Sequence, residues 1–324
     1  MIQPEALLQQ YFGHKAFRAG QKQAIDAILS GRDVLAVMPT GAGKSVCYQI
    51  SALLLPGVTI VISPLISLMK DQVEALRQVG IPAAYINSSI SQEEFYHSMQ
   101  MLQQGQCRIL YVAPERLMTE SLLRLAQRVQ ISMIAVDEAH CVSQWGQDFR
   151  QSYLDIPVFM EQLPVRPVCT AFTATATKQV EADIARILKL RDPETIHTGF
   201  DRKNLFFGVR RPNSKMTELF HLLKENDGKS GIVYCSTRKA VEEVCASLCD
   251  TGFDATRYHA GLSDVERAQN QDDFLYDRKP IMVATNAFGM GIDKSNVSFV
   301  IHYNMPMDLE SYYQEAGRAG RDGE

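Results

Sequence analysis

A glycine pair, a lysine and a serine lie between two apolar segments in the sequence MPTGAGKS. Gly41 and Gly43 predict a tight turn at which the backbone approaches a ligand, because glycine weakens regular helices and strands. Lys44 and Ser45 follow at the start of an expected helix, whose free N–H groups attract anions. This arrangement is typical of nucleotide phosphate binding, although Met38 stands where the strict pattern has glycine. An ordinary strand–turn–helix connection with a surface lysine is the alternative.

Two neighbouring carboxylates end an apolar segment further along, in SMIAVDEAH. Asp137 could hold Mg²⁺, and Glu138 could orient or deprotonate an attacking water. Lys44 would then neutralise phosphate charge, and Ser45 would ligate the metal. An acidic helix start is the structural alternative. The position of these carboxylates after a strand of the same predicted sheet favours a site for ATP or another nucleoside triphosphate.

Two arginines lie among glycines near the end of the sequence, in QEAGRAGRDG. Arg318 and Arg321 could stabilise a γ-phosphate in the transition state of hydrolysis. A basic helix C-terminus would explain their charge, since the helix dipole favours it, but it would not explain three glycines. If the arginines come from a second domain, nucleotide would close a cleft and hydrolysis would reopen it.

Apolar strand-like segments alternate with helical patterns, which predicts βαβ units and parallel sheets. The expected strands lie at 33–38, 59–63, 82–86, 108–113, 132–137 and 167–172, and in a second series at 230–235, 255–259, 280–285 and 298–304. A chain of 324 residues exceeds the usual size of one core, so we expect two domains with a hinge near 198–206. Ligands collect beyond the carboxyl ends of such strands, where the residues above lie.

The composition is that of an ordinary soluble globular protein, with 46% hydrophobic and 22% charged residues. The net charge of −4 means that any surface for nucleic acid must be local. The longest apolar stretch is broken by Pro56 and Gly57, so we expect no membrane span and no secretory signal. The seven cysteines are scattered and predict buried thiols in a reducing compartment rather than a zinc site.

Nine motifs follow one another along nearly the whole chain: LQQYFGHKAFRAGQ, MPTGAGKS, SPLISLMKDQ, YVAPERL, VDEAHCVSQWGQDFR, FTATAT, IVYCSTR, VATNAFGMGIDK and SYYQEAGRAGRDG. In these motifs the chain resembles the RecQ family of DNA helicases, within the superfamily of two-lobed DEAD/DEAH-box-type motors. The stretch from DEAH into SQWG-DFR, and the FG…FR…Q block before the phosphate turn, are specific for RecQ.

The resemblance implies an α/β fold with two tandem RecA-like parallel-sheet domains of P-loop NTPase type, with helices on both faces. The expected domains are residues 1–199, the ATP-binding domain, and residues 200–324, the helicase C-terminal domain. The implied cofactors are ATP and Mg²⁺, without zinc. The implied activity is DNA-stimulated ATP hydrolysis with 3′-to-5′ movement on single-stranded DNA and unwinding of partly duplex DNA in recombination and repair. A bacterial cytoplasmic location is expected, and the sequence does not identify protein partners.

The resemblance also assigns roles to individual residues. Gln21 is similar to the glutamine that reads the adenine edge, with Arg18 near the base. SQWGQDFR is similar to a loop that senses single-stranded DNA, where aromatic rings stack on bases at roughly 1–3 kcal/mol each. Trp145 and Phe149 could instead form a helical core stripe with Tyr153, and for Tyr153 we favour the core.

The complete set of site residues groups by role. The expected catalytic residues are Lys44, Asp137, Glu138, Gln314, Arg318 and Arg321. The expected nucleotide-binding residues are His14, Arg18, Gln21, Thr40, Gly41, Gly43, Lys44, Ser45 and Asp293, with Ser45 and Asp137 as the Mg²⁺ ligands. The expected residues for DNA binding and coupling are Ser143, Gln144, Trp145, Phe149, Arg150, Thr173 and Thr175.

Several positions depart from the family pattern. His14 replaces an aromatic ring that stacks on adenine, which puts nucleotide affinity in question. Gln147 and Gln151 stand where histidine and proline are common in the loop, and Lys203 replaces a proline in the hinge. Full-length relatives continue into a last strand, a zinc segment and a winged helix beyond the position of Glu324. We therefore expect weak unwinding from this chain.

Three other functions remain open. An RNA remodelling enzyme would share the fold, but the FG…FR…Q and SQWG blocks argue against it. A nucleotide-switched binding module without turnover would not need Glu138 or the two arginines. A filament-forming recombinase would need one lobe and a basic polymerising surface, and the sequence indicates neither.

Overall fold

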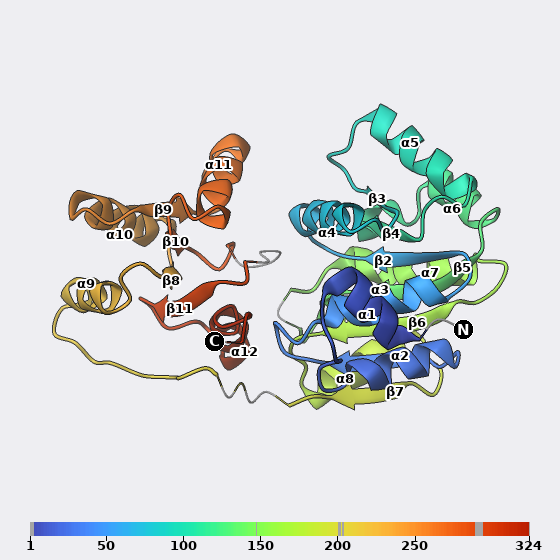
Figure 1. Ribbon diagram of the computed structural model, residues 1–324, viewed down its shortest axis with the longest axis horizontal. Helices are drawn as coiled ribbons and strands as arrows, with labels where there is room; N and C mark the ends of the chain where they lie inside the picture. The colour runs from blue at the N-terminus through green and yellow to red at the C-terminus, as the bar shows by residue number, and fades with distance from the viewer. Residues whose placement is uncertain (1–2, 147, 200–201, 203, 289–293, 324) are drawn as a thin grey trace. The chain divides into compact units, whose positions relative to one another are not determined.

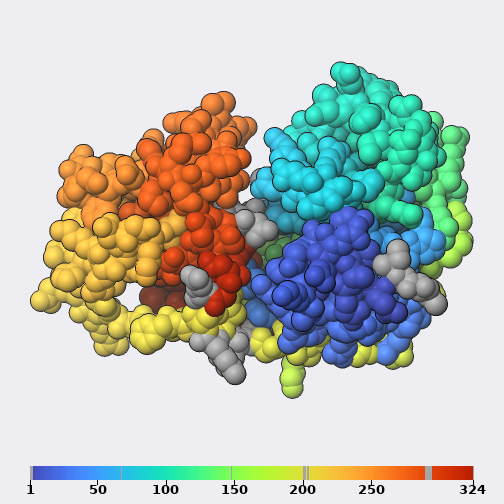
Figure 2. Space-filling model, viewed as in Figure 1, coloured from blue at the N-terminus to red at the C-terminus, as the bar shows by residue number. Residues whose placement is uncertain are grey.

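Two compact units make up the chain, residues 1–200 and residues 201–324, in a computed structural model (Figure 1). The structure describes residues 3–146, 148–199, 202, 204–288 and 294–323. Each unit is built on its own parallel sheet, which confirms the predicted α/β fold with two tandem sheet domains. Figure 2 shows one outer face of the first unit, coloured from blue to yellow-green, and of the second, coloured from yellow to red.

The first unit contains seven parallel strands in the order β3-β4-β2-β5-β6-β1-β7. The strands are β1 Val34–Val37, β2 Val58–Ile62, β3 Ala83–Ile86, β4 Ile109–Val112, β5 Ile131–Val136, β6 Val168–Thr173 and β7 Glu194–His197. The α-helices are α1 Pro4–Phe12, α2 Gln21–Leu29, α3 Lys44–Leu54, α4 Ile66–Gln78, α5 Gln92–Gln103, α6 Glu120–Ala126, α7 Asp155–Glu161 and α8 Lys178–Ile187. Short 3₁₀ turns lie at η1 Pro114–Arg116, η2 Ala139–Val142 and η3 Gln151–Leu154.

Helices cover both faces of this sheet because its strands are apolar on both sides. Ile60 and Ile62 of β2 belong to a core cluster with side chains of α5, α6, α7 and α8. Val61, between them, belongs to a second cluster with side chains of α1, α2, α3 and α4. The period of two along a strand therefore divides the core of this unit into two layers.

The second unit has four parallel strands in the order β11-β8-β10-β9. They are β8 Ser230–Tyr234, β9 Ala255–Tyr258, β10 Ile281–Ala284 and β11 Val297–His302. The helices are α9 Lys215–Glu225, α10 Arg238–Asp250, α11 Asp264–Leu275 and α12 Leu309–Ala316. Val233 packs with residues of α9 and α10, while its neighbours Ile232 and Tyr234 pack with Phe274 of α11. This sheet is thus also covered on both faces.

Candidate active site

The carboxyl ends of β1, β6 and β5 lie side by side and carry three of the predicted motifs. Val37 pairs with Thr173 across β1 and β6, and Val136 pairs with Ala171 across β5 and β6. The Met38 N–H donates to the Thr173 carbonyl at 2.9 Å, which extends the pairing towards the glycine turn. The phosphate turn, the two carboxylates and the threonines therefore meet at one edge of the sheet, the edge where ligands bind in such folds.

The turn after β1 has the backbone geometry of an anion site. Gly41 and Gly43 have φ values of 82° and 77°, a region in which other residues are strained. α3 begins at Lys44, directly after Gly43, so its first N–H groups have no partner within the helix. Lys44 Nζ donates to the Met38 carbonyl at 3.2 Å, which brings the ammonium back to the turn. The turn thus offers backbone donors and a cation to a phosphate.

Gln21 is buried against the same turn. Its Nε2 donates to the carbonyls of Ala42 and Gly43 at 2.9 and 3.1 Å, and its Oε1 accepts from the Arg18 N–H at 2.8 Å. A Cβ at position 43 would lie 2.4 Å from Gln21 Nε2, so any other residue there would displace the Gln21 amide from these bonds. The Arg18 guanidinium donates to the Gly41 carbonyl. Both residues therefore brace the phosphate turn, and their predicted contacts with adenine stay a prediction.

The other residues predicted for nucleotide lie around this turn or outside the described part of the chain. Thr40 and Ser45 are half-buried within it, and His14 is exposed in the segment between α1 and α2. Asp293 lies outside the described residues.

Asp137 lies directly after β5 and is only 7% exposed. Burial raises the pKa of its carboxyl to about 7, the charge of Glu138 adds to the rise, and Lys44 opposes it. The Tyr153 hydroxyl donates to the Asp137 carbonyl at 2.9 Å and holds the backbone in place. A buried carboxylate of this kind gains from a neighbouring cation, so it fits the predicted Mg²⁺ ligand.

Glu138 adopts a strained backbone conformation, with φ 47° and ψ 49°. The left-handed region costs a non-glycine residue roughly 1–2 kcal/mol. Its Oε2 is buried 3.4 Å from His140 Nδ1, and it has no hydrogen-bond partner within the described parts of the chain. Strain together with an unsatisfied oxygen is typical of functional residues, and this oxygen could accept a proton from a bound water.

His140 connects Glu138 to the end of β6. Its Nδ1 lies 2.9 Å from Thr173 Oγ1, and the Thr173 hydroxyl donates its one proton to the Thr175 carbonyl. His140 Nδ1 must therefore carry a hydrogen and donate it to Thr173. Thr173 and Thr175 carry a predicted coupling role, whereas His140, the last residue of the DEAH tetrapeptide, has no role predicted from the sequence.

The loop between η2 and η3 presents two aromatic rings to solvent. Trp145 is 75% exposed and Phe149 37% exposed, whereas Tyr153 is fully buried. The segment is not helical, so a helical stripe is wrong for Trp145 and Phe149, and the favoured core placement of Tyr153 is confirmed. Gln144 is exposed beside Trp145, and a side chain at Gly146 would meet the His140 carbonyl.

The Arg150 side chain connects this loop to a neighbouring segment of the first unit. Its guanidinium donates to Asp148 Oδ2 at 2.8 and 2.9 Å and to the Pro64 carbonyl at 2.9 Å. These contacts hold the loop to the segment after β2. The predicted contact of Arg150 with DNA stays a prediction, and it would compete with these bonds.

In the second unit, the predicted arginines follow α12. Gln314 is half-buried within that helix, and Arg321 is partly exposed after it. Arg318 is only 5% exposed and lies by Tyr234, whose pKa is raised by burial and lowered in part by this guanidinium. Arg318 is therefore a buried cation of the second sheet, whereas Arg321 is the more accessible of the two.

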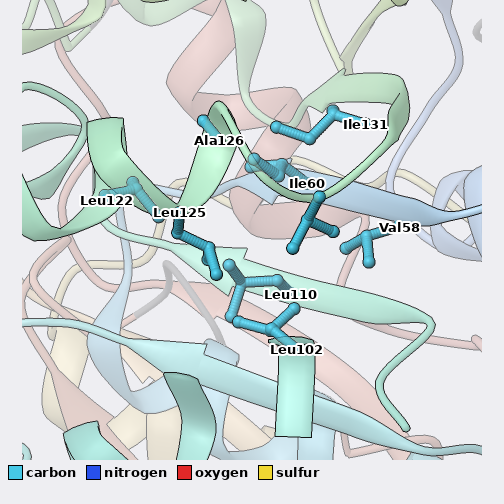
Figure 3. A pocket seen from close by; sticks show the side chains of 9 residues that line it. Val58, Ile60, Leu102, Leu110, Leu122, Leu125, Ala126 and Ile131 are labelled. Atoms are coloured by element: carbon cyan, nitrogen blue, oxygen red, sulfur yellow. The ribbon is translucent and has the colours of Figure 1, made fainter. Parts of the chain in front are cut away.

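A small cavity in the first unit offers no competing site. Its volume is about 10 Å³, about one water probe, and its walls are aliphatic (Figure 3). The lining residues are Val58, Ile60, Leu102, Leu110, Leu122, Leu125, Ala126, Val129 and Ile131. The cavity is a packing feature beneath α5 and α6, without a polar group to orient a ligand.

Among the described residues, no three His, Cys, Asp or Glu side chains gather as a metal cage. Mg²⁺ in nucleotide sites is held by one or two protein ligands together with phosphates, so such a cage is not required here. Within the same part of the chain, no helix is long and apolar enough to cross a membrane.

Comparisons with known proteins agree with this architecture. Residues 18–183 match the DEAD/DEAH box helicase family, and residues 214–323 match the helicase conserved C-terminal domain. The fold is similar to that of Saccharomyces cerevisiae Dbp5 bound to RNA and ADP BeF3, with a TM-score of 0.77 at 20% identity over 100% of this chain and 85% of that one. The fold and the site thus define a two-domain helicase core.

The chain belongs to the DEAD/DEAH box helicase family, and its relatives place it on the RecQ branch. It is 49% identical over 320 residues to the ATP-dependent DNA helicase RecQ of Bacillus subtilis, covering 98% of this chain and 54% of that protein. It is 42% identical to the ATP-dependent helicase wrn-1 of Caenorhabditis elegans, covering 98% of this chain and 31% of that protein. The chain thus spans about half or less of these relatives.

Proposed function

We propose that this chain is a DNA-stimulated ATPase of RecQ type that uses ATP hydrolysis to move 3′ to 5′ along single-stranded DNA. The observation that carries the proposal is the placement of the Lys44 turn and of Asp137 and Glu138 at the same edge of the sheet, after β1 and β5, the two strands that flank β6. A phosphate turn without this acidic pair would support binding alone. The similarity to RecQ proteins supports DNA as the substrate.

Each residue at this edge has a distinct task in the proposed reaction. Lys44 and the N–H groups of the turn would hold the β- and γ-phosphates, and Ser45 and Asp137 would hold Mg²⁺. When bound, Mg²⁺ neutralises phosphate charge. Glu138 orients the attacking water and takes its proton through the unsatisfied Oε2. Water exclusion would strengthen these interactions further.

The second unit completes the proposed reaction. Arg321 would stabilise the charge that develops on the γ-phosphate, and Gln314 would assist at the phosphates. The partial exposure of Arg321 supports this choice over the buried Arg318. Arg318 would then act by fixing the segment that carries Arg321.

The loop with Trp145 and Phe149 is the proposed sensor of single-stranded DNA. Rings that are exposed in part or in large part are suited to stack on unpaired bases. The loop joins the ATP site directly, because Tyr153 at its end bonds to Asp137 and His140 at its start bonds to Thr173. We place this activity in the bacterial cytoplasm, in DNA recombination and repair.

Steady-state ATP hydrolysis, with and without single-stranded DNA, tests the proposal. We expect magnesium-dependent turnover that DNA stimulates and that RNA of matched sequence stimulates less. Lys44→Ala and Glu138→Gln should abolish turnover while the fold is retained. Equal stimulation by RNA would favour the RNA remodelling function, and equally inert wild-type and Glu138→Gln proteins would favour a switch without turnover.

A further inference from the structure

Two side chains at the start of the second unit converge on the turn that follows α12. Arg202 and Asn204 belong to the segment that enters this unit from the first, more than a hundred residues before the turn. The turn comprises residues 317–320 and lies between the helix and Arg321. Figure 1 shows α12 beside the chain's end in the second unit.

The contacts are made with backbone carbonyls. The Arg202 guanidinium donates to the carbonyls of Ala319 at 3.1 Å and Gly320 at 2.5 Å, and more weakly to that of Gly317 at 3.5 Å. The Asn204 amide donates to the Gly320 carbonyl at 2.9 Å. Arg202 Nε also donates to Asn204 Oδ1 at 3.3 Å, so the two side chains orient each other.

The grouping of these carbonyls explains why a guanidinium suits this place. Gly317 caps α12, and Ala319 and Gly320 follow it in the turn, so three carbonyl oxygens with partial negative charge lie within reach of one side chain. The planar fork of arginine can serve several of them at once, which a lysine ammonium does less well. On the other side, the Gly320 N–H donates to the Val297 carbonyl of β11 at 2.8 Å. The residue directly before Arg321 is therefore held through both its N–H and its carbonyl.

We propose that Arg202 and Asn204 are positioning residues that set the direction of the Arg321 side chain. The inference rests on the proposed function, in which Arg321 stabilises the hydrolysis transition state. Gly320 has a φ of 60°, and glycine can adopt other backbone conformations at little cost. The hydrogen bonds to its N–H and carbonyl therefore fix the direction in which the chain leaves towards Arg321. The holding groups, Arg202 and Asn204, thus belong to the same unit as the turn but lie more than a hundred residues before it in the chain.

A purely structural cap would give a different pattern of losses from a positioning role. A cap contributes to stability, and its loss would affect the free energy of unfolding and leave the chemistry of the folded fraction unchanged. A positioning residue acts on the transition state, so its loss lowers kcat with little change in KM for ATP.

The first experiment measures kcat and KM for ATP in Arg202→Gln, Asn204→Asp and a matched control, Arg210→Gln. Arg210 lies in the same segment but pairs with Glu218 and Glu225 on the surface. We expect Arg202→Gln and Asn204→Asp each to lower kcat at least about tenfold while KM stays within about threefold of the wild-type value. The control should match wild type in both constants. Asn204→Asp is nearly isosteric and puts an oxygen against the Gly320 carbonyl, so it carries the test if Arg202→Gln does not fold.

The second experiment is a double-mutant cycle with Arg321→Ala. If Arg202 acts through Arg321, Arg202→Gln should cause no further loss of kcat in the Arg321→Ala background. If Arg202→Gln lowers kcat in the Arg321→Ala background by the same factor as in wild type, the inference is overturned. A wild-type kcat in both Arg202→Gln and Asn204→Asp would overturn it too. Absence of turnover in the wild-type protein would instead reject the proposed function.

Discussion

Ser143 Oγ donates to Asp183 Oδ2 at 2.8 Å, and this bond ties the start of the Trp145 loop to α8. Both side chains are buried, with 0% and 7% exposure. The same hydroxyl accepts from the Trp145 N–H at 3.1 Å, so one oxygen serves both the loop and the helix. Ser143, one of the residues predicted for DNA binding and coupling, thus lies under the loop and not on its surface.

Ser143→Ala should therefore destabilise the protein and loosen the loop. The change leaves a buried carboxylate oxygen and a backbone N–H without this partner, at a cost of about 1–3 kcal/mol. Urea denaturation measures the loss, and Ser247→Ala, at a half-buried position on α10 where the hydroxyl donates to the Glu243 carbonyl of the same helix, is the control. If Ser143→Ala is as stable as the control, the bond between Ser143 and Asp183 does not contribute to the free energy of unfolding.

Asp137→Asn should stabilise the protein in the absence of magnesium. The raised pKa means that the folded state holds a proton more tightly than the unfolded state between about pH 4 and pH 7. The contribution of the Asp137 carboxyl to the free energy of unfolding therefore falls as the pH rises from about 4 to about 7, and it stays low above pH 7. At pH 8 the neutral amide should raise the free energy of unfolding by about 1–3 kcal/mol.

The pH dependence distinguishes this cause from a general effect of the substitution. The stability difference between Asp137→Asn and wild type should be small near pH 5 and should grow towards pH 8, as measured by urea denaturation with a chelator present. A difference that does not change with pH would mean that the carboxylate is not destabilised by burial.

The fold was predictable because apolar runs mark buried parallel strands, and every strand predicted from such a run is present. β7 was missed because only Ile196 of its four residues is buried, so no apolar run exists to reveal it. The spacing of Trp145, Phe149 and Tyr153 suggested a helix, but the glycine at 146 is packed against the His140 carbonyl and the chain turns there instead.

The site was predictable in its residue types and less so in its geometry. Asp137 and Glu138 were identified from the end of a strand, but the left-handed conformation of Glu138 has no signature in the residue itself. The contacts of Gln21 and Arg202 were not predictable for a similar reason. Both side chains bind backbone carbonyls far along the chain, and carbonyls are common to all residues.

Gln21→Glu should weaken ATP binding. A carboxylate oxygen would replace the amide that donates to the Ala42 and Gly43 carbonyls, and like partial charges would then face each other at about 3 Å. The turn must rearrange, so KM for ATP should rise at least about tenfold. Gln10→Glu, which adds the same charge at an exposed position on α1, is the control. An unchanged KM would show that the turn does not depend on Gln21.

Trp145→Ala should separate ATP hydrolysis from its stimulation by DNA. The ring is 75% exposed, so its removal should change the free energy of unfolding by less than about 0.5 kcal/mol. Basal turnover should stay, because Asp137, Glu138 and the Lys44 turn are untouched. The concentration of single-stranded DNA that gives half-maximal stimulation should rise roughly fivefold or more, since one stacked base is worth about 1–3 kcal/mol. Tyr96→Ala, which removes an exposed ring from α5, should leave that concentration unchanged. If Trp145→Ala and Tyr96→Ala respond to DNA alike, the loop is not the sensor, and the exposure of its rings needs another explanation.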